Sequence, residues 1–323
     1  MFFSVVIPLF NKAPYVEKAV RSVLSQSYTD YELIIVDDGS RDGSFDIALK
    51  CIQGYGNCHI YKQRNAGVSM ARNLGAQLSQ GNYLCFLDAD DWWEPTFLEE
   101  MKGLVERYPN AGIYGTGYFI VKNGEKRVAP IGVEEGFEEG FINYCQVYAK
   151  TLCMPLTSIT VAIRREVFEE QGGFNSNLDL GEDFDLWIRV SLTNNVVLLN
   201  RPLSNYNQDV DPTYRGTHRG KHHPRNPDKH YLWNIDYLAA EEKQNPDLKL
   251  LVDKLRAYTL MPYYLDRKLR ARAKTELAKI NWDSLPAKTR LRYRLPIPLL
   301  KTNKLILSML LKIKRMIKNG KGI

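Results

Sequence analysis

The stretch YLCFLDADDWWEP, residues 83–95, joins an apolar run to a dense cluster of negative charge. Its first five residues have the length and composition of a buried β-strand. Three carboxylates follow within four positions, at Asp88, Asp90 and Asp91. Like charges this close repel one another, and burial raises carboxyl pKa values further. The sequence therefore predicts a positive partner here, and carboxylate oxygens suit Mg²⁺ or Mn²⁺. A solvated turn in which Asp91 caps the next helix is the alternative.

Short β-type runs and helix-type patterns alternate around this stretch. Such alternation predicts an α/β protein with a mostly parallel central sheet flanked by helices. Ligands of these sheets bind beyond the carboxyl ends of the strands, and polar residues follow four of the predicted strands. The strand-type runs are 3–9, 31–40, 59–64, 83–87 and 111–121, the helix-type runs are 14–26, 68–79 and 95–108, and the polar residues are Asn11, Asp37–Asp38, Arg64–Asn65 and Asp88–Asp91.

The second half of the chain is less regular. Residues 158–174 have the pattern of a strand that runs into a helix, and 182–194 have that of a helix with an acidic start. A further strand is predicted at 196–200, and the pattern beyond Asp228 is helical to about residue 280. The predicted organisation is a main domain at 1–212, a loop and helical extension at 213–283, and a basic tail at 284–323.

Composition and charge restrict the class of protein. The chain has 44 basic and 37 acidic residues, a net charge of +7. Eleven of the basic residues and none of the acidic ones lie beyond residue 283, so the body is slightly acidic, which disfavours a nucleic-acid binder. Five cysteines without a CxxC pair favour reduced thiols in a cytoplasmic protein. We expect the N-terminal run to be a strand and not a signal peptide.

The tail segment 303–318 is amphipathic when drawn as a helix, with lysines, an arginine and a serine on one arc and mostly Leu, Ile and Met on the other. Its longest uncharged run, 305–311, is far shorter than the ~20 residues that span a bilayer. Such a helix lies in the interface of an anionic membrane. The alternative is a helix packed on the body with solvated lysines.

The chain contains four notable segments, FSVVIPLFNKAPYVEKAVRSVLSQSYTDYELIIVDDGSRDGS (3–44), NAGVSMARNLGA (65–76), FLDADDWWEP (86–95) and GGFNSNLDLGEDFDLWIRV (172–190). Together they resemble glycosyltransferase family 2, the inverting enzymes of GT-A fold, of the type that acts in bacterial surface-polysaccharide synthesis. They occur in the family's order and lie within residues 3–206. The resemblance implies transfer of a sugar from a nucleotide diphosphosugar, with a UDP-sugar favoured, to an acceptor hydroxyl with inversion at the anomeric carbon.

The resemblance also implies a nucleotide-sugar site at the carboxyl ends of the first four strands. Pro8 and Phe10 would border the nucleobase, and Asp38 would accept its N–H. Asn65 and Arg72 would lie near the nucleotide, although for Arg72 the alternative is an ion pair on a helix surface. Asp88 and Asp90 would hold the ribose and Mn²⁺ or Mg²⁺, with Asp90 the direct metal ligand.

The resemblance implies that Asp183, in GEDFD, is the catalytic base that removes the proton of the acceptor hydroxyl. Glu182 and Asp185 are its rivals. Asp183 and Trp187 share one helical face, so Trp187 and Glu182 are candidates for the acceptor pocket. The alternative is that the acids at the start of this helix only complement its dipole.

The segment 213–230 is basic and holds four of the five histidines. We expect a lid in which His218 and Arg215 contact the diphosphate or the metal. A zinc site is the alternative, although no cysteine joins the histidines and their spacing matches no zinc finger.

The leading hypothesis is an enzyme on the cytoplasmic face of a bacterial membrane that uses a lipid-linked glycan as acceptor, because such an acceptor requires a surface-bound enzyme. A sugar nucleotidyltransferase would need a glycine-rich, basic phosphate loop after the first strand, and IPLFNKAPY at 7–15 lacks one. A nucleotide-sugar-binding or scaffolding protein with a degenerate site would be expected to lack Asp90 or Asp183, and both are present.

Overall fold

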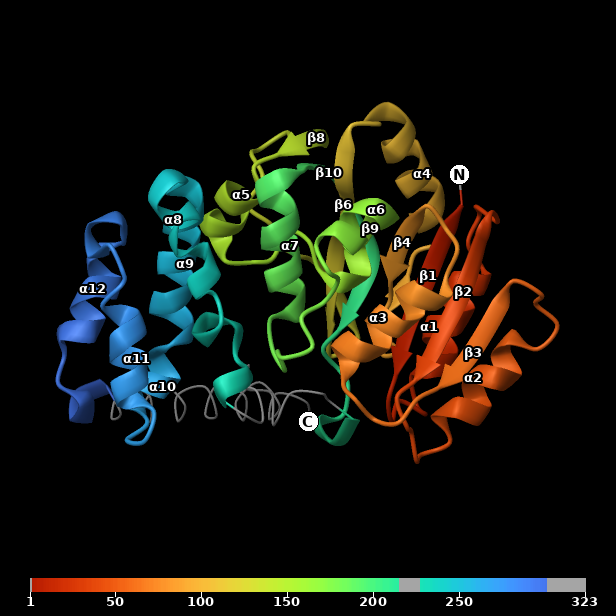
Figure 1. The fold of residues 1–323 in the computed structure, drawn as a ribbon, viewed down its shortest axis with the longest axis horizontal. Helices are drawn as coiled ribbons and strands as arrows, with labels where there is room; N and C mark the ends of the chain where they lie inside the picture. The colour runs from red at the N-terminus through yellow and green to blue at the C-terminus, as the bar shows by residue number, and fades with distance from the viewer. Residues whose placement is uncertain (1, 215–226, 301–323) are drawn as a thin grey trace, which may run out of the picture. The chain divides into compact units, whose positions relative to one another are not determined.

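The computed structural model describes residues 2–214 and 227–300, which form two compact units, one ending at Ala239 and the other starting at Ala240 (Figure 1). The first unit therefore extends beyond residue 212, the predicted end of the main domain. The predictions for Arg215, His218 and the tail 303–318 concern residues outside the described ones.

The first unit is built on a ten-stranded sheet in which the first four strands run parallel in the order β3-β2-β1-β4. Every residue of β1 and β2 is buried, as expected for strands covered on both faces. These strands are β1 (Phe3–Leu9), β2 (Tyr31–Asp37), β3 (Cys58–Lys62) and β4 (Tyr83–Phe86).

Beyond β4 the sheet is mixed. The strand β9 (Val161–Arg164) runs antiparallel between β4 and β6 (Ala111–Lys122), and β10 (Asn195–Asn207) is parallel to β6. The predicted α/β fold with a largely parallel sheet is confirmed, with its parallel part at the strands that precede the polar loops. Three shorter strands pair antiparallel with this sheet. The strands β5 (Trp92–Trp93) and β8 (Glu139–Ile142) pair with β10, and β7 (Glu125–Val128) pairs with β6.

The two tryptophans that follow the acidic cluster belong to β5. The Trp93 ring is buried and stacked on Phe97 with 4.0 Å between centroids, and its Nε1 donates to the carbonyl oxygen of Ile159 at 2.7 Å. The ammonium of Lys18 lies 3.0 Å from the ring centroid of Trp92. Trp93 is therefore a core residue of this sheet edge.

Helix α3 (Val68–Leu78), which lies largely in the second family segment, packs against the sheet and contacts the fourth segment. A Cβ on Gly75 of α3 would lie 2.3 Å from Val6 Cγ1, so glycine allows α3 to pack closely on β1. Asn73 of α3 donates to the carbonyl oxygen of Phe174 at 2.8 Å and accepts from its N–H at 2.9 Å. The helices of this unit are α1 (Val16–Leu24), α2 (Ser44–Ile52), α3 (Val68–Leu78), α4 (Phe97–Arg107), α5 (Tyr144–Thr151), α6 (Arg165–Glu170) and α7 (Glu182–Thr193).

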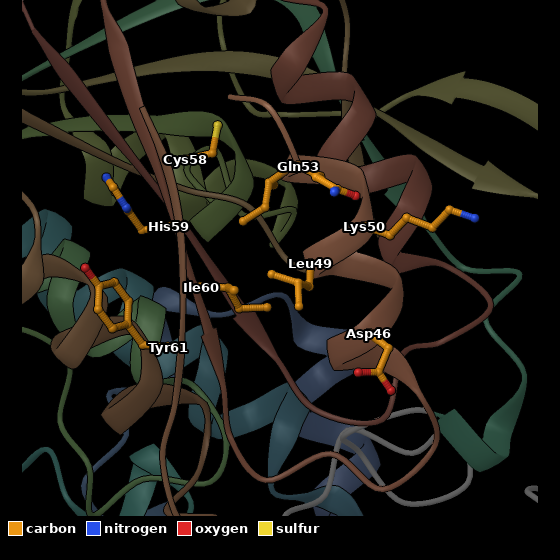
Figure 2. A pocket seen from close by; sticks show the side chains of 9 residues that line it. Asp46, Leu49, Lys50, Gln53, Cys58, His59, Ile60 and Tyr61 are labelled. Atoms are coloured by element: carbon orange, nitrogen blue, oxygen red, sulfur yellow. The ribbon is translucent and has the colours of Figure 1, made fainter. Parts of the chain in front are cut away.

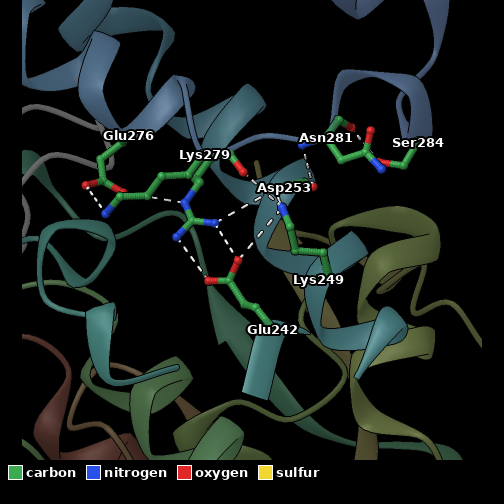
Figure 3. Close-up of polar contacts among 8 residues, drawn as sticks. Glu242, Lys249, Asp253, Glu276, Lys279, Asn281 and Ser284 are labelled. Atoms are coloured by element: carbon green, nitrogen blue, oxygen red, sulfur yellow. Dashed lines mark hydrogen bonds and ion pairs between the residues drawn. The ribbon is translucent and has the colours of Figure 1, made fainter. Parts of the chain in front are cut away.

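The second unit is helical and holds a buried ionic network (Figure 3). Arg256 donates to both carboxylate oxygens of Glu242, at 2.8 and 3.0 Å, and Lys249 pairs with Asp253. Because the buried charges are paired, the network links its helices without leaving a lone charge. Among the described residues no helix is long and apolar enough to cross a membrane. The helices are α8 (Glu241–Gln244), α9 (Pro246–Thr259), α10 (Met261–Leu265), α11 (Arg270–Leu277) and α12 (Ala287–Arg294).

Candidate active site

The loops that follow β1 and β2 are tied together at one edge of the sheet. Asn11 N donates to Ser40 Oγ at 3.0 Å, Arg41 N donates to Asn11 Oδ1 at 2.9 Å, and Lys12 N donates to Ser44 Oγ at 2.7 Å. Asn11 adopts a left-handed conformation, with φ of +50°. The polar residues that follow these strands therefore gather in space, as the alternating pattern predicts.

Asp38, the predicted nucleobase contact, is buried and accepts four hydrogen bonds. The donors are Gln63 Nε2 and Ala66 N, both at 2.7 Å, Gly67 N at 2.9 Å and Asn65 Nδ2 at 3.0 Å. A carboxylate offers about four lone-pair positions, so these bonds use its whole capacity. In this structure Asp38 holds the loop 63–67, and Asn65 takes part in that contact. Their contacts with a nucleotide stay predictions.

The two predicted walls of the nucleobase site differ in exposure. Pro8 is buried within β1, whereas the side chain of Phe10, one residue beyond the strand, is 40% exposed. Of the two, Phe10 therefore presents a ring to solvent at the edge where the polar loops meet.

The acidic cluster finds its positive partners within the protein. Arg72 Nη2 donates to Asp88 Oδ1 at 2.6 Å, and Lys12 Nζ pairs with Asp90 Oδ2. The second oxygen of Asp88 makes no hydrogen bond or ion pair within the described part of the chain, and this side chain is 31% exposed. Burial raises the pKa of Asp90, and the charge of Asp88 adds to this effect while Lys12 opposes it.

Asp91 has a structural environment of its own. It is buried and accepts a hydrogen bond from Asn207 N at 2.7 Å, which connects the cluster to β10. Burial, together with the charges of Asp90 and Asp88, raises the pKa of Asp91 well above its usual value. Helix α4 begins at Phe97 with Thr96 at its N-cap, so the alternative in which Asp91 caps this helix is wrong.

Arg72 bridges the acidic cluster and the start of α7. Its Nη1 donates to Glu182 Oε1 at 2.9 Å, while Nη2 holds Asp88, and the guanidinium carbon lies 5.0 Å from the ring centroid of Phe174. Burial alone would lower the pKa of Arg72, but Asp88 and Glu182 outweigh it and raise the value. The side chain is only 2% exposed, so an ion pair on a helix surface is excluded. Its contact with the nucleotide stays a prediction.

Asp183 is held at the first turn of α7. Gly181, directly before the helix, has φ of +81°, and a Cβ there would lie 2.2 Å from Tyr231 Cδ1. Asp183 Oδ1 accepts a hydrogen bond from Phe184 N at 2.8 Å. This bond also satisfies one of the backbone N–H groups in the first turn of the helix, which lack a partner within the helix. Burial and the charge of Glu182 raise the pKa of Asp183 to about 7, although Arg72 opposes them. A carboxyl with this pKa can exchange a proton near neutral pH.

The other acids and the tryptophan of α7 have structural partners. Asp185 is buried, pairs with Arg189 at 2.9 Å and accepts from Tyr237 Oη at 2.8 Å. Trp187 is fully buried, with its ring edge-on to Phe174 at 5.9 Å between centroids. Asp183 and Trp187 share one face of α7, as the helical period predicts, but Trp187 is buried in the core and does not line an accessible pocket in this structure. Glu182 is the partner of Arg72.

Lys12 is not identified as a site residue by the sequence, nor are the three tyrosines whose hydroxyls interact with the charge of Asp183. Burial raises the pKa values of Tyr118, Tyr144 and Tyr148, and the charge of Asp183 adds to the effect at each. The hydroxyl of Tyr144 is buried without a hydrogen-bond partner among the described residues. No local signal marks these tyrosines, whereas Lys12 lies in the first of the four family segments, just beyond the end of a predicted strand.

Two further observations concern possible ligand sites. A hollow of about 610 Å³ lies between α2 and the outer strand β3, and Figure 2 shows Leu49, Lys50, His59 and Tyr61 at its walls. None of the residues that line it is a predicted site residue. Within 2–214 and 227–300, no group of three or more His, Cys, Asp or Glu side chains could hold a metal ion by itself.

Solved structures of Staphylococcus aureus TarS share the fold. For TarS 1–349 in complex with UDP-GlcNAc the TM-score is 0.67 at 16% identity, over 90% of this chain and 83% of that one. The predicted GT-A architecture is thereby confirmed.

Curated relatives are similar over parts of their length. The amylovoran biosynthesis glycosyltransferase AmsB of Erwinia amylovora is 31% identical over 219 residues, 63% of this chain and 69% of AmsB. TuaG of Bacillus subtilis, named for teichuronic acid biosynthesis, is 38% identical over 120 residues, 36% of this chain and 47% of TuaG. The chain spans 57% of a Rickettsia prowazekii glycosyltransferase and 32% of a longer one from Rickettsia felis, at 28% and 29% identity.

The family model described as "Glycosyl transferase family 2" matches residues 4–172, which is more than half of the chain and includes the first three motifs. The chain therefore belongs to glycosyl transferase family 2.

Proposed function

We propose that the protein is a metal-dependent, inverting glycosyltransferase that moves a sugar from a nucleotide diphosphosugar to an acceptor hydroxyl. The observation that carries the proposal is the connection of Asp183, with its pKa of about 7, to the acidic cluster through Glu182, Arg72 and Asp88. These contacts link a carboxyl group that can accept a proton to the edge of the sheet where the polar loops meet.

The donor half of the site would lie at that edge. Phe10 offers an exposed ring, and the loops after β1, β2 and β3 are fixed by hydrogen bonds that involve Asn11, Asp38 and Asn65. Family membership and the likeness to TarS, whose solved complex contains UDP-GlcNAc, favour a UDP-sugar as donor.

A divalent cation fits the carboxylates at the end of β4. Asp88 and Asp90 are hard oxygen ligands, and two carboxylates with the donor's phosphates are a common set for Mg²⁺ or Mn²⁺. Asp88 retains an oxygen without a described partner. Bound there, the cation would offset the negative charge that develops on the leaving diphosphate.

Asp183 would act as the base. The acceptor oxygen attacks the anomeric carbon from the face opposite the diphosphate, its proton passes to an Asp183 carboxylate oxygen, and the bond to the diphosphate oxygen breaks with the electron pair. One in-line displacement inverts the anomeric carbon. Glu182 would remain beside the acceptor as the partner of Arg72, which holds the first turn of α7 in place.

The acceptor is proposed to be a lipid-linked glycan of surface-polysaccharide synthesis on the cytoplasmic face of the membrane. The names of AmsB and TuaG, which refer to amylovoran and teichuronic acid biosynthesis, support a polysaccharide acceptor. The segment 303–318 would bind anionic lipid, with Arg215 and His218 contributing to a lid over the diphosphate.

Transfer of label from a radioactive UDP-sugar panel to lipid-linked glycans extracted from bacterial membranes would test this function. We expect one donor to label the lipid fraction in the presence of Mn²⁺, and the Asp183→Asn variant to bind UDP while it labels nothing. GDP- and dTDP-sugars serve as controls. UDP binding without transfer for any donor or lipid fraction would favour a binding or scaffolding protein.

A further inference from the structure

We propose that Lys12 competes with the divalent cation for Asp90, and so sets the metal affinity of the donor site. This inference rests on the proposed function, because it takes Asp90 as a metal ligand. Lys12 Nζ forms an ion pair with Asp90 Oδ2, the carboxylate predicted to hold the metal directly.

The ion pair lies in an environment where charge matters. The side chains of Lys12 and Asp90 are 14% and 19% exposed. Attraction between charges is screened less here than between fully exposed side chains, whose ion pairs contribute little. An ammonium that leaves Asp90 therefore gives up a substantial interaction, which a metal ion has to replace.

The position of Lys12 is fixed by its backbone. Its N–H donates to Ser44 Oγ at 2.7 Å, and its carbonyl oxygen accepts from Tyr15 N and Val16 N, both at 2.9 Å. The next residue, Ala13, donates its N–H to Asp42 Oδ2 at 3.0 Å. The loop is thus held in place, while the four-carbon side chain of lysine can swing its ammonium away without a change in the backbone.

The partner of Lys12 is fixed in the same way. The carbonyl oxygen of Asp90 accepts from Asn207 Nδ2 at 3.1 Å, and Asn207 N donates to the neighbouring Asp91. The backbone at both ends of the ion pair is therefore held by the fold, and exchange of the ammonium for a metal ion requires movement of side chains alone.

The second carboxylate of the pair differs in this respect. Arg72, the partner of Asp88, is 2% exposed and also bound to Glu182, so it cannot withdraw without leaving two carboxylates unpaired. The cluster thus combines one permanently neutralised acid, Asp88, with one acid, Asp90, whose counter-ion can be replaced. A divalent cation on Asp90 and an ammonium on the same carboxylate would repel each other, so each weakens the binding of the other.

The test is binding of Mn²⁺ to the full-length protein in the presence of UDP, whose phosphates complete the proposed ligand set, followed by the electron paramagnetic resonance signal of free Mn²⁺. We expect Lys12→Met, which retains the apolar stem, to bind Mn²⁺ at least about tenfold more tightly than the wild type. Lys12→Arg retains the charge and should stay within about twofold of the wild type. Lys18→Met is the matched control, because Lys18 lies over Trp92 and not at Asp90.

Unchanged or weaker Mn²⁺ binding by a folded Lys12→Met variant would overturn the proposal. Such a result would mean that the ammonium of Lys12 does not oppose binding of the cation. Titrations of the wild type with and without UDP separate this failure from failure of the proposed function. Wild-type protein that binds Mn²⁺ with UDP, beside an unchanged variant, refutes only the role of Lys12. Absence of Mn²⁺ binding with and without UDP in both proteins refutes the metal site as well.

Discussion

Arg72 and Glu182, 110 residues apart in the sequence, form a buried ion pair in which Nη1 lies 2.9 Å from Oε1. The same guanidinium holds Asp88 at the end of β4. One side chain of α3 thereby fixes the start of α7, which bears Asp183, relative to the acidic cluster. Arg72 thus connects the proposed base to the proposed donor site.

Replacement of Arg72 by methionine should reduce both stability and UDP affinity. The change leaves Asp88 and Glu182 without their shared cation, and loss of one partner of a buried ion pair costs on the order of 3 kcal/mol. Urea unfolding measures the free energy of unfolding, and Arg21→Met, which removes an exposed arginine paired with Glu17, is the control. Equal stability of the two variants would show that the bridge contributes nothing.

The rate of transfer should rise with pH around neutrality. The pKa of Asp183 is raised to about 7, so its carboxylate is protonated below that value and unable to accept a proton, and it becomes active as the pH rises through about 7. The pH profile of kcat/KM tests this with any competent donor and acceptor. Because the charge of Glu182 contributes to the shift, Glu182→Gln should move the midpoint to lower pH. A profile that is flat between pH 5.5 and 8.5, a range set around the value of about 7, would remove Asp183 from the role of base.

Gly181→Ala should disturb the first turn of α7 more than glycine replacement at a comparable turn. The positive φ alone costs on the order of 1 kcal/mol for alanine, and the added Cβ would also meet the ring of Tyr231 at 2.2 Å. Gly172 has φ of +70°, and a Cβ added there would have no atom within 4 Å, so Gly172→Ala isolates the backbone strain. We expect Gly181→Ala to lower both thermal stability and kcat/KM further than the control. Indistinguishable variants would mean that Tyr231 does not fix this turn.

The sequence allowed much of the fold to be predicted, because the strands and helices up to β6, except β5, have clear local periodicity. The edge at which their polar residues meet followed from the parallel order. What could not be predicted depends on contacts between distant segments: β5 forms only because Trp92 and Trp93 pair with β10, and Asn205 donates to the carbonyl oxygen of Trp92 from 113 residues away.

The candidate site shows the same division. The motif residues Asp88, Asp90 and Asp183 could be selected from their order along the chain, but the partners that neutralise them could not. Lys12 and Arg72 reach the acids across 78 and 16 residues respectively, through side chains whose direction no local pattern reveals. For Trp187, helical spacing places the residue on the face of α7 that bears Asp183, but it does not reveal that Trp187 is buried against Phe174.

Removal of the tail should release the protein from membranes without affecting the donor site. Truncation after Leu300 retains the described second unit, in which Leu300 packs with Met261 and Leu265. We expect the truncated protein to lose sedimentation with liposomes that contain anionic lipid, while its affinity for UDP is unchanged. Neutral liposomes are the control. Undiminished sedimentation would contradict the assignment of the membrane contact to the tail.

Calorimetric titration of UDP into the wild-type protein and into Asp90→Asn, each with and without Mn²⁺, asks most directly whether the carboxylates at the end of β4 form a metal-dependent donor site. We expect Mn²⁺ to strengthen UDP binding to the wild type and to have little effect on the variant, with GDP and dTDP binding more weakly. Absence of UDP binding would contradict this assignment. So would UDP binding that is equally tight with and without Mn²⁺, or equally tight in the wild type and in Asp90→Asn, because these carboxylates would then not hold the metal that the donor requires.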